Sequence, residues 1–328
     1  MSQIRKPVEA KGRFKNSEQE RHHGFFFSTF RMWLKSVPTR FSYLSHSFDD
    51  WLVSETPLKT AQKPTITWIG HSTFLIQVQG INILTDPIFF NISTFFKRNL
   101  PPGIALGHLP PIDVVLISHN HWDHMHGPSL MALRDNITTR EGQILVPHGD
   151  QHWFIRRKFN RVNSYTWGKH ELIAGPAGDD AVKITFLPAW HWSRRGIFDR
   201  NKSLWGSWMI EAGGHTIYFA GDTAYSDHFA EISAAFPKID IALLPIGPCE
   251  PRGAMKHTHI DANEAGQAFL DLKAQTFIPM HWGTFNFGFD RFLTPVEKID
   301  QWWQGQNFEN AQKIAMFKVG QRKEFASE

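Results

Sequence analysis

Cysteine is almost absent from this sequence, and long apolar runs are missing altogether. The single thiol, Cys249, can form no intramolecular disulfide and cannot build a cysteine-type zinc site. Any metal must therefore be held by carboxylates and by some of the 18 histidines. No stretch approaches the roughly 20 uninterrupted apolar residues that cross a bilayer, and residues 1–23 lack the apolar core of a signal peptide. These absences predict a protein inside the cell, either cytoplasmic or peripheral on the inner face of the membrane.

An excess of one charge is also missing from most of the chain. The formal net charge is +4, but residues 1–45 hold nine basic and three acidic side chains, so this segment carries +6 and the rest carries −2. A nucleic-acid-binding protein normally has a basic patch on its body, so no nucleic-acid partner is expected. With 328 residues, 41% of them hydrophobic, and only 24 Gly and 19 Pro, the chain is predicted to be globular, as one large or two ordinary domains.

The basic segment also carries a stripe of apolar side chains. Phe26, Phe30, Trp33 and Val37 recur at the spacing of one helix face. Such a helix either docks on its own domain or lies in a membrane interface, with aromatic side chains at the headgroup level and basic side chains on anionic lipid. The sequence does not separate these two interpretations.

Beyond a polar linker at residues 54–63, short apolar runs alternate with amphipathic segments. Strands are predicted at residues 65–69, 74–78, 81–85, 113–118, 144–146, 182–187, 207–210, 216–220, 241–246 and 276–280. Helical spacing is present at residues 227–236, 261–273 and 295–304, and Asp261 followed by Glu264 fits a capping box. Two groups of strands, each accompanied by helices, predict a layered α/β protein with two packed sheets.

Histidines gather at the end of the predicted strand at residues 113–118. His119, His121, Asp123 and His124 lie within six residues, where a loop can turn several side chains toward one point. One tetrahedral ion cannot easily take all four ligands from so short a segment, so two ions are the natural solution, and they need ligands from elsewhere. Three further candidates have the same position just past a predicted strand: His191, Asp222 and His281.

These residues and several short motifs resemble one branch of a known superfamily. The motifs are WIGH at 68–71, LTDP at 84–87, PPID at 110–113, LWGSW at 204–208, AGDT at 220–223, PIG at 245–247 and HWGT at 281–284. With the HNHWDH run at 119–124, they resemble the metallo-β-lactamase superfamily, and within it the N-acylphosphatidylethanolamine-hydrolysing phospholipase D branch. The resemblance extends over about residues 65–285. It implies an α/β fold (α+β layered), the four-layer αββα metallo-β-lactamase-like sandwich, with a dinuclear metal site at one edge.

The resemblance also implies which residues bind which ion. It assigns His119, His121 and His191 to one ion, Asp123, His124 and His281 to the other, and Asp222 to both as a bridge. Zinc is the expected metal because the ligands mix imidazole with carboxylate and lack thiolate, and iron or manganese would tolerate the same set. The chain is then divided into a basic, aromatic extension at residues 1–60 and a hydrolase domain at residues 61–328.

The predicted reaction is phosphodiester hydrolysis. Two close divalent ions that share a carboxylate can hold a water, lower its pKa toward neutrality, and neutralise charge on the phosphate during attack by the metal-bound hydroxide. The candidate catalytic residues are Asp123, Asp222 and His259, the last of which matches a histidine near the metals of the resembled branch. His259 is interpreted as a phosphate contact or as the acid that protonates the leaving group, and the alternative is a surface histidine at the start of a helix. In that branch, cleavage on the headgroup side of phosphorus releases an N-acylethanolamine and leaves phosphatidic acid.

Several nearby residues have two interpretations each. Asp86 is either a partner for the far ring nitrogen of a ligand histidine or a turn residue before Pro87. His71 either supports the ligands, which is the favoured interpretation, or caps a turn, whereas His257 is expected in solvent. Four tryptophans either line a lipid groove or pack in the core: Trp190, Trp192, Trp205 and Trp208.

Two other function classes are compatible with the same metals. One is a metal-dependent hydrolase of a soluble lactone, ester or cyclic phosphodiester, because substrate choice depends on the pocket and not on the fold. The other is a protein with structural metals, which is disfavoured because four protein ligands usually close a structural zinc site. The expected partners are a phospholipid or other phosphodiester substrate and a peripheral membrane contact, and a homodimer is left open.

Overall fold

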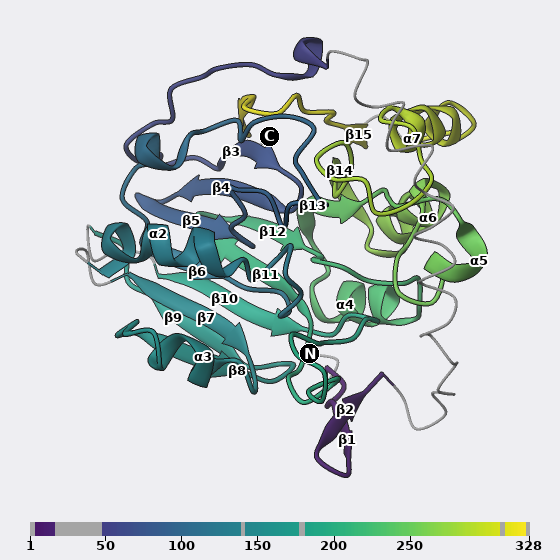
Figure 1. Ribbon diagram of the computed structural model, residues 1–328. Coiled ribbons are helices and arrows are strands. Elements are labelled where there is room, and N and C mark those ends of the chain that lie inside the picture. The colour runs from purple at the N-terminus through teal and green to yellow at the C-terminus, as the bar shows by residue number, and fades with distance from the viewer. Residues whose placement is uncertain (1–3, 17–47, 139–141, 177–180, 309–311, 326–328) are drawn as a thin grey trace.

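Two seven-stranded mixed sheets pack face to face, with helices on both outer faces (Figure 1). This arrangement is seen in a computed structural model, which describes residues 4–16, 48–138, 142–176, 181–308 and 312–325. The predicted four-layer αββα sandwich is thereby confirmed. Among the described residues, no helix combines the length and apolarity needed to cross a membrane.

The first sheet has the strand order β16-β3-β4-β5-β6-β7-β8. Its strands are β3 (Thr65–Gly70), β4 (Thr73–Val78), β5 (Ile81–Thr85), β6 (Val114–Leu116), β7 (Gln143–Pro147), β8 (Val162–Tyr165) and β16 (Arg322–Glu324). The helices beside it are α2 (Gly127–Thr138) and α3 (Gln151–Ile155), with a short 3-10 turn at Leu106–His108. Strands β5, β6, β7 and β8 run parallel, so their carboxyl ends share one edge of the sheet.

The second sheet has the strand order β15-β14-β13-β12-β11-β10-β9. Its strands are β9 (His170–Ile173), β10 (Val182–Leu187), β11 (Ser207–Ala212), β12 (His215–Phe219), β13 (Ile239–Pro245), β14 (Ala274–Met280) and β15 (Lys313–Ile314). Its helices are α4 (His228–Ala235), α5 (Arg252–Met255), α6 (Ala262–Asp271) and α7 (Thr294–Gln304). The parallel strands β12, β13 and β14 again deliver their carboxyl ends to one edge.

Apolar side chains fill two cores, because the strands of the first sheet are buried on both faces. Trp68 and Phe74 belong to the core that they share with Phe186 and Trp208 of the second sheet. Alternate residues of the same strands, such as Leu75, belong to a separate core with α2 and α3. Continuous apolar runs are the expected sequence pattern for strands in this position, and these runs allowed the strands to be predicted.

The observed elements agree with most of the predicted ones. Strands β5 and β10 have the predicted bounds, and the other predicted strands and the three predicted helices are present with small shifts at their ends. At the start of α6, the side chain of Asp261 accepts a hydrogen bond of 2.9 Å from the backbone N–H of Glu264, as a capping residue does. The helical stripe predicted from Phe26 to Val37 lies outside the described residues.

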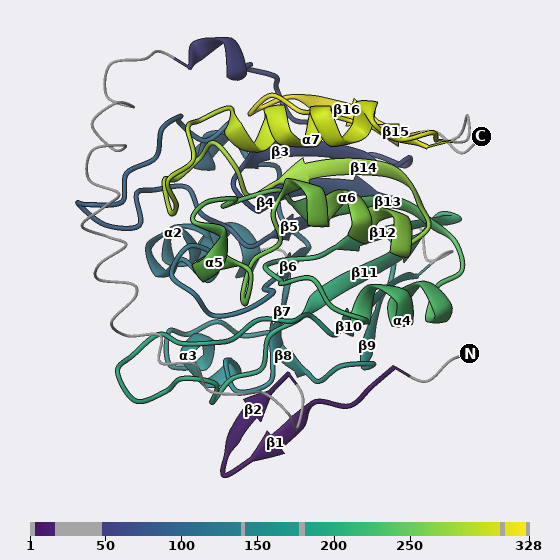
Figure 2. The ribbon, with the colours of Figure 1, turned by 90° about the vertical axis from the view of Figure 1, so that its right-hand side faces the viewer.

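The N-terminal part of the chain packs on the sandwich wherever the structure describes it. Residues 4–16 form a hairpin of β1 (Val8–Ala10) and β2 (Arg13–Lys15), at one end of the molecule in Figures 1 and 2. A 3-10 turn follows at Asp49–Trp51, and the N–H of Val53 then donates to the carbonyl of Val319. These contacts join both described stretches before residue 60 to the body of the protein.

Candidate metal centre

Loops at the carboxyl ends of six strands bring histidines and aspartates to one point. The strands are β3, β5, β6, β10, β12 and β14, and their loops belong to both sheets. Two sets of four side chains each place one candidate ligand atom per residue within 4.8 Å of the others. We call them the first donor group, which is His119, His121, His191 and Asp222, and the second donor group, which is His71, Asp123, His124 and His281.

In the first donor group, the ring nitrogens converge to hydrogen-bonding distance of one another. Nδ1 of His121 lies 2.8 Å from Nε2 of His119 and 3.2 Å from Nε2 of His191. The carboxylate of Asp222 is 3.8 Å from Nε2 of His191 and 3.9 Å from Nε2 of His119. Three imidazoles and one carboxylate oxygen thus surround a single small space.

In the second donor group, the carboxylate of Asp123 is the common neighbour. Its Oδ2 atom lies 3.1 Å from Nε2 of His71, 3.3 Å from Nε2 of His124 and 3.9 Å from Nε2 of His281. Asp222 reaches this group as well, because Oδ2 is 3.2 Å from Nε2 of His124 and Oδ1 is 3.1 Å from Nε2 of His281. Asp222 therefore stands between the two groups, at the position that the resemblance assigns to a bridging ligand.

The donor atoms fit divalent cations. Among the described residues, Nε2 of His124, Nε2 of His281 and Oδ1 of Asp222 are buried, and although each lies within 3.3 Å of a neighbouring donor-group atom, none makes a well-aligned hydrogen bond. An unsatisfied buried polar atom costs about 1–3 kcal/mol, so this convergence is unfavourable for the protein alone. A cation that accepts these lone pairs would satisfy all of them. The seven ligands proposed from the sequence all lie in the two groups, and His71 is the additional member.

Protonation favours metal binding as well. Burial lowers the pKa of His121 to about 4 and that of His191 to about 3, and it holds the pKa of His119 well below its ordinary value. These imidazoles are therefore neutral at neutral pH, as a metal ligand must be. His124 differs: burial lowers its pKa, but the carboxylates of Asp222 and Asp123 outweigh burial and raise it well above the ordinary value. The negative potential of these two carboxylates, which attracts a proton to His124, would also attract a metal cation.

Each of four candidate ligand imidazoles has its far nitrogen fixed by an acceptor. Nδ1 of His124 donates to Asp86 over 2.7 Å, and Nδ1 of His119 contacts Oγ of Ser118 at 2.9 Å. Ser118 in turn donates to Asp86 over 2.6 Å, so one carboxylate supports a ligand in each group. This confirms the predicted contact of Asp86 with a candidate ligand, and such partners fix both the tautomer and the ring orientation.

The other two imidazoles donate to backbone carbonyls. Nδ1 of His191 donates to Thr258 over 2.7 Å, and Nδ1 of His281 donates to Gly247 over 3.0 Å. The backbone of His281 has a φ of 60°, a value that side-chain-bearing residues rarely adopt, and His71 and Asp86 share this feature. Such conformations concentrate at functional sites, where the surrounding structure enforces them.

Glycine is required directly before Asp222. Gly221 has a φ of +60°, and a Cβ atom placed on it would lie 2.5 Å from Cβ of Ser118. The carboxylate can therefore approach the histidine loop only if residue 221 has no side chain. This contact gives a physical reason for the glycine in the AGDT motif.

His259 lies beside the centre, and His257 does not. Nδ1 of His259 is 3.7 Å from Oδ2 of Asp222, and the ring stacks edge-on to His191 at 5.2 Å between centroids. Burial lowers the pKa of His259 to about 3, so the ring is neutral at neutral pH. His257 is exposed, as expected from the sequence.

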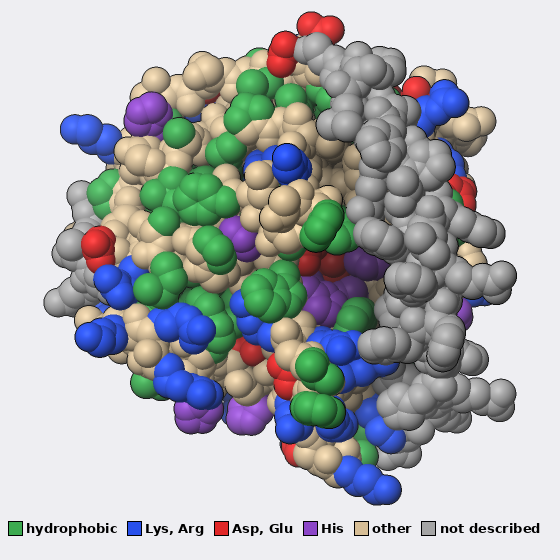
Figure 3. All heavy atoms as spheres, in the orientation of Figure 1, with side chains coloured by type: hydrophobic (Ala, Val, Ile, Leu, Met, Phe, Trp, Pro, Cys, Tyr) green, Lys and Arg blue, Asp and Glu red, His purple; other side chains and the backbone are tan. Residues whose placement is uncertain are grey.

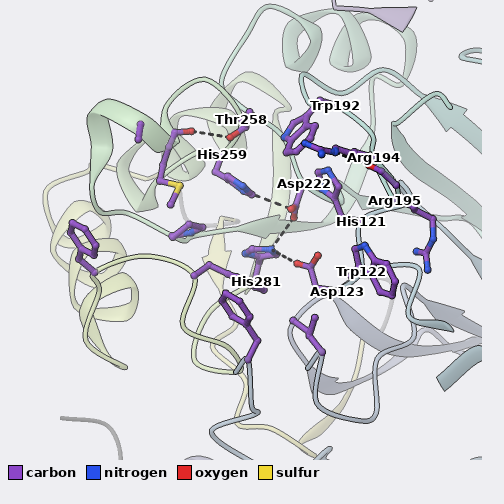
Figure 4. Close-up of a pocket in the computed structure, with 18 of the residues that line it drawn as sticks. His121, Trp122, Asp123, Trp192, Arg194, Arg195, Asp222, Thr258, His259 and His281 are labelled. Atoms are coloured by element: carbon purple, nitrogen blue, oxygen red, sulfur yellow. Dashed lines mark hydrogen bonds and ion pairs between the residues drawn. The ribbon is translucent and has the colours of Figure 1, made fainter. Parts of the chain in front are cut away.

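A cavity of about 730 Å³ opens above these side chains. Figure 4 shows His121, Asp123, Asp222, His259 and His281 directed toward one another at its floor. Its apolar walls come from the segment after β5 and from segments near the carboxyl ends of the second sheet: Ile92, Phe96, Ile197, Met255, Phe287 and Phe289. In Figure 3, histidine and acidic side chains lie in a hollow that is bordered by hydrophobic and basic ones.

Two arginines and one tryptophan on the cavity wall come from the loop after His191. Arg194 and Arg195 line the cavity. The motifs did not reveal them, although they follow the candidate ligand His191 by only three and four residues. Trp192 also lines the cavity, whereas Trp205 and Trp208 are fully buried in the core. Trp190 is half-buried and does not line this cavity.

Comparison with known proteins agrees with this architecture. Residues 81–282 match the family described as a beta-lactamase superfamily domain. The N-acyl-phosphatidylethanolamine-hydrolyzing phospholipase D 1 of Caenorhabditis elegans is 32% identical over 249 residues, which cover 72% of this chain and 68% of the worm protein. This chain belongs to the beta-lactamase superfamily. Within it, the worm match places the chain in the N-acylphosphatidylethanolamine phospholipase D-like branch.

Two further proteins show how far the likeness to this superfamily extends. The mitochondrial N-acyl-phosphatidylethanolamine-hydrolyzing phospholipase D of Saccharomyces cerevisiae is 34% identical over 242 residues, or 71% of this chain and 50% of the yeast protein. The solved structure of Igni18, a metallo hydrolase from Ignicoccus hospitalis, has a TM-score of 0.61 at 23% identity and covers 81% of this chain and 100% of that one. The chain thus matches about two thirds of the worm enzyme and half of the yeast enzyme, and it shares the superfamily fold with Igni18.

Proposed function

We propose that this protein is a dinuclear-metal phosphodiesterase of the phospholipase D type. Its proposed substrate is N-acylphosphatidylethanolamine or a related phospholipid, cleaved on the headgroup side of phosphorus to an N-acylethanolamine and phosphatidic acid. The observation that carries the proposal is Asp222, which lies between two donor groups at the floor of a cavity with apolar walls. Membership of the branch that contains the worm enzyme supports the choice of substrate.

Two zinc ions are the proposed cofactors, and iron or manganese would suit the same imidazole and carboxylate donors. His119, His121 and His191 would hold one ion, and Asp123, His124 and His281 the other, with Asp222 shared. Ions bound there would activate a water for attack on phosphorus and neutralise charge on the phosphate. The protein's own contribution is to hold these donors neutral, oriented and apart from bulk water.

Other cavity residues suit a phosphodiester. The neutral ring of His259 keeps one N–H, which can donate a hydrogen bond to a phosphate oxygen or to the departing oxygen. Arg194 and Arg195 place permanent positive charge on the wall, where guanidinium groups can pair with phosphate oxygens. Burial lowers the pKa of Arg195 to about 10, which still leaves it charged at neutral pH.

Apolar side chains around the cavity favour a lipid over a small soluble substrate. Ile92, Phe96, Phe287 and others form walls against which acyl chains can lie. Next to these walls, Phe95, Ile197 and Phe198 have 77%, 76% and 81% of their surface exposed. Exposed aromatic and aliphatic groups beside basic residues are typical of a peripheral contact with an anionic membrane, and we include this contact in the proposal.

The proposal is tested by the products formed from N-acylphosphatidylethanolamine in mixed micelles. Zinc-loaded protein should yield phosphatidic acid and free N-acylethanolamine by mass spectrometry, and the His121→Ala variant or chelator-treated protein should yield neither. Metal-loaded protein that leaves this lipid intact but hydrolyses a soluble lactone or cyclic phosphodiester would replace the proposed substrate class.

A further inference from the structure

The hairpin at residues 4–16 is bound to the loop that carries His191. The backbone N–H of Phe14 donates to the carbonyl of Asn201 over 2.7 Å, and Nδ2 of Asn201 donates back to the carbonyl of Phe14 over 3.1 Å. Arg13 donates to the carbonyls of Phe198 and Arg200 in the same loop. The hairpin lies outside residues 81–282, which the family model matches.

Asn16, directly after this hairpin, contacts a candidate metal ligand. This residue is buried, with only 7% of its surface exposed. Nδ2 donates to the backbone carbonyl of His191 over 3.0 Å, and Oδ1 accepts from the backbone N–H of His191 over 3.2 Å. The amide of Asn16 thus pairs with both backbone polar groups of His191, as a neighbouring strand would.

A third contact fixes which way the amide points. Nε1 of Trp205, an obligate donor, reaches Oδ1 of Asn16 over 3.0 Å. If the amide turned over, its NH₂ group would face two donors, Nε1 of Trp205 and the N–H of His191. The observed orientation is therefore the one that satisfies all three partners.

The backbone of His191 needs such a partner because strand β10 ends at Leu187. Beyond Leu187, the chain no longer pairs with β11. The ring of His191 is held separately by the carbonyl of Thr258. Main chain and ring together decide where Nε2 of His191 points in the first donor group.

We propose that Asn16 is a positioning residue for the candidate metal ligand His191, which makes residues 4–16 part of the metal centre and not a separable extension. This inference rests on the proposed function, because it assigns His191 to a metal. Removing the side chain would leave the N–H and C=O of His191 without these partners, and the indole N–H of Trp205 with only the carbonyl of Ala189. Loss of such supporting contacts typically weakens metal affinity about 10–100-fold.

The test compares Asn16→Ala with Glu9→Ala, an exposed site in the same hairpin. Each metal-free full-length protein is titrated with Co²⁺, and the visible absorption and the affinity of each bound equivalent are recorded. We expect Asn16→Ala to bind one equivalent about 10–100-fold more weakly, with an altered spectrum, and to keep the other. Glu9→Ala should match the wild type in both.

Thermal unfolding separates positioning from a general loss of stability. A purely structural role would lower the Tm of metal-free and metal-loaded protein alike, whereas positioning reduces the rise in Tm that metal produces. If Asn16→Ala does not fold, Asn16→Asp keeps the acceptor for Trp205 and is expected to show a smaller loss of the same kind. Wild-type affinity and spectrum in both Asn16 variants would overturn the inference. A wild type that binds no Co²⁺ would overturn the proposed function itself.

Discussion

At the scale of single residues, burial decides which groups can carry a proton. The imidazoles of the first donor group are neutral because burial lowers their pKa values, and only His124 is drawn toward the charged state by two carboxylates. A site with this pattern has few protons to displace when a cation binds. The donor set is thus prepared for metal by the protein alone.

His259 is expected to act on the substrate and not on the metals. His259→Ala should lower kcat about 10²–10³-fold, because a positioned hydrogen-bond donor to the developing charge contributes this much, while the bound metal content stays unchanged. Metal analysis and kinetics on N-acylphosphatidylethanolamine micelles measure both. His257→Ala is the matched control, since this exposed neighbour is two residues away. A large loss of metal in His259→Ala would instead make His259 a ligand.

Asp150 is expected to make stability fall as pH rises. This carboxyl group accepts a hydrogen bond from Asn120, which lies between two candidate ligands, and burial raises its pKa to about 7. Between the unfolded pKa of about 3.9 and this value, the folded state binds a proton that the unfolded state has released. The stabilising contribution of protonated Asp150 is therefore fully present below about pH 4 and is lost as pH rises through about 7.

The variant Asp150→Asn removes this titration. Relative to the wild type, its free energy of unfolding should rise by about 2–3 kcal/mol between pH 5 and pH 8. Denaturant unfolding of metal-loaded wild type and variant at each pH gives this difference, and effects of pH on the metals largely cancel in the comparison. A difference that does not change with pH would show that Asp150 keeps an ordinary pKa.

At the scale of elements, the sequence predicts those strands and helices whose signals come from residues close together in the chain. Strands such as β5 and β10 are short runs rich in β-branched and other apolar residues, and the Asp261 cap of α6 is set by residues three apart, so both were predictable. Helix α2 was missed, although Leu130, Leu133 and Ile137 recur at helical spacing and are buried in its core. The short strands β1 and β2 have little apolar content, so pattern alone gave no signal for them.

The two loops beside the cavity are expected to bind membranes. Phe95 lies in one of these loops and Phe198 in the other, and neither lines the cavity. The double variant Phe95→Ser/Phe198→Ser should bind vesicles that contain phosphatidylglycerol at least about tenfold more weakly, because two exposed apolar side chains no longer leave water. Turnover of a short-chain, water-soluble phosphodiester should stay near that of the wild type. Vesicle co-sedimentation and kinetics measure the two properties.

Leu172→Ser provides the matched control for this membrane contact. Leu172 is 58% exposed on β9 and does not line the cavity, so its loss should leave vesicle binding unchanged. Equal vesicle binding by the wild type and the double variant would remove these loops from the membrane contact.

At the scale of the whole molecule, the fold joins residues that no local pattern connects. The HNHWDH run could be read as a metal site from its spacing, and its distant partners follow strands in the sequence, so most of the candidate site was predictable. The contact of Asn16 with His191 was not, because it spans 175 positions and a hairpin of low apolar content. Long-range contacts of this kind depend on how the two sheets pack.

In the proposed reaction, water attacks phosphorus and the bond between phosphorus and the headgroup oxygen breaks. It is tested most directly by turnover of N-acylphosphatidylethanolamine in H₂¹⁸O, followed by mass spectrometry of both products. Phosphatidic acid should carry one ¹⁸O atom in its phosphate, and the N-acylethanolamine should carry none. Label in the hydroxyl group of the N-acylethanolamine, or in a released fatty acid, would contradict it.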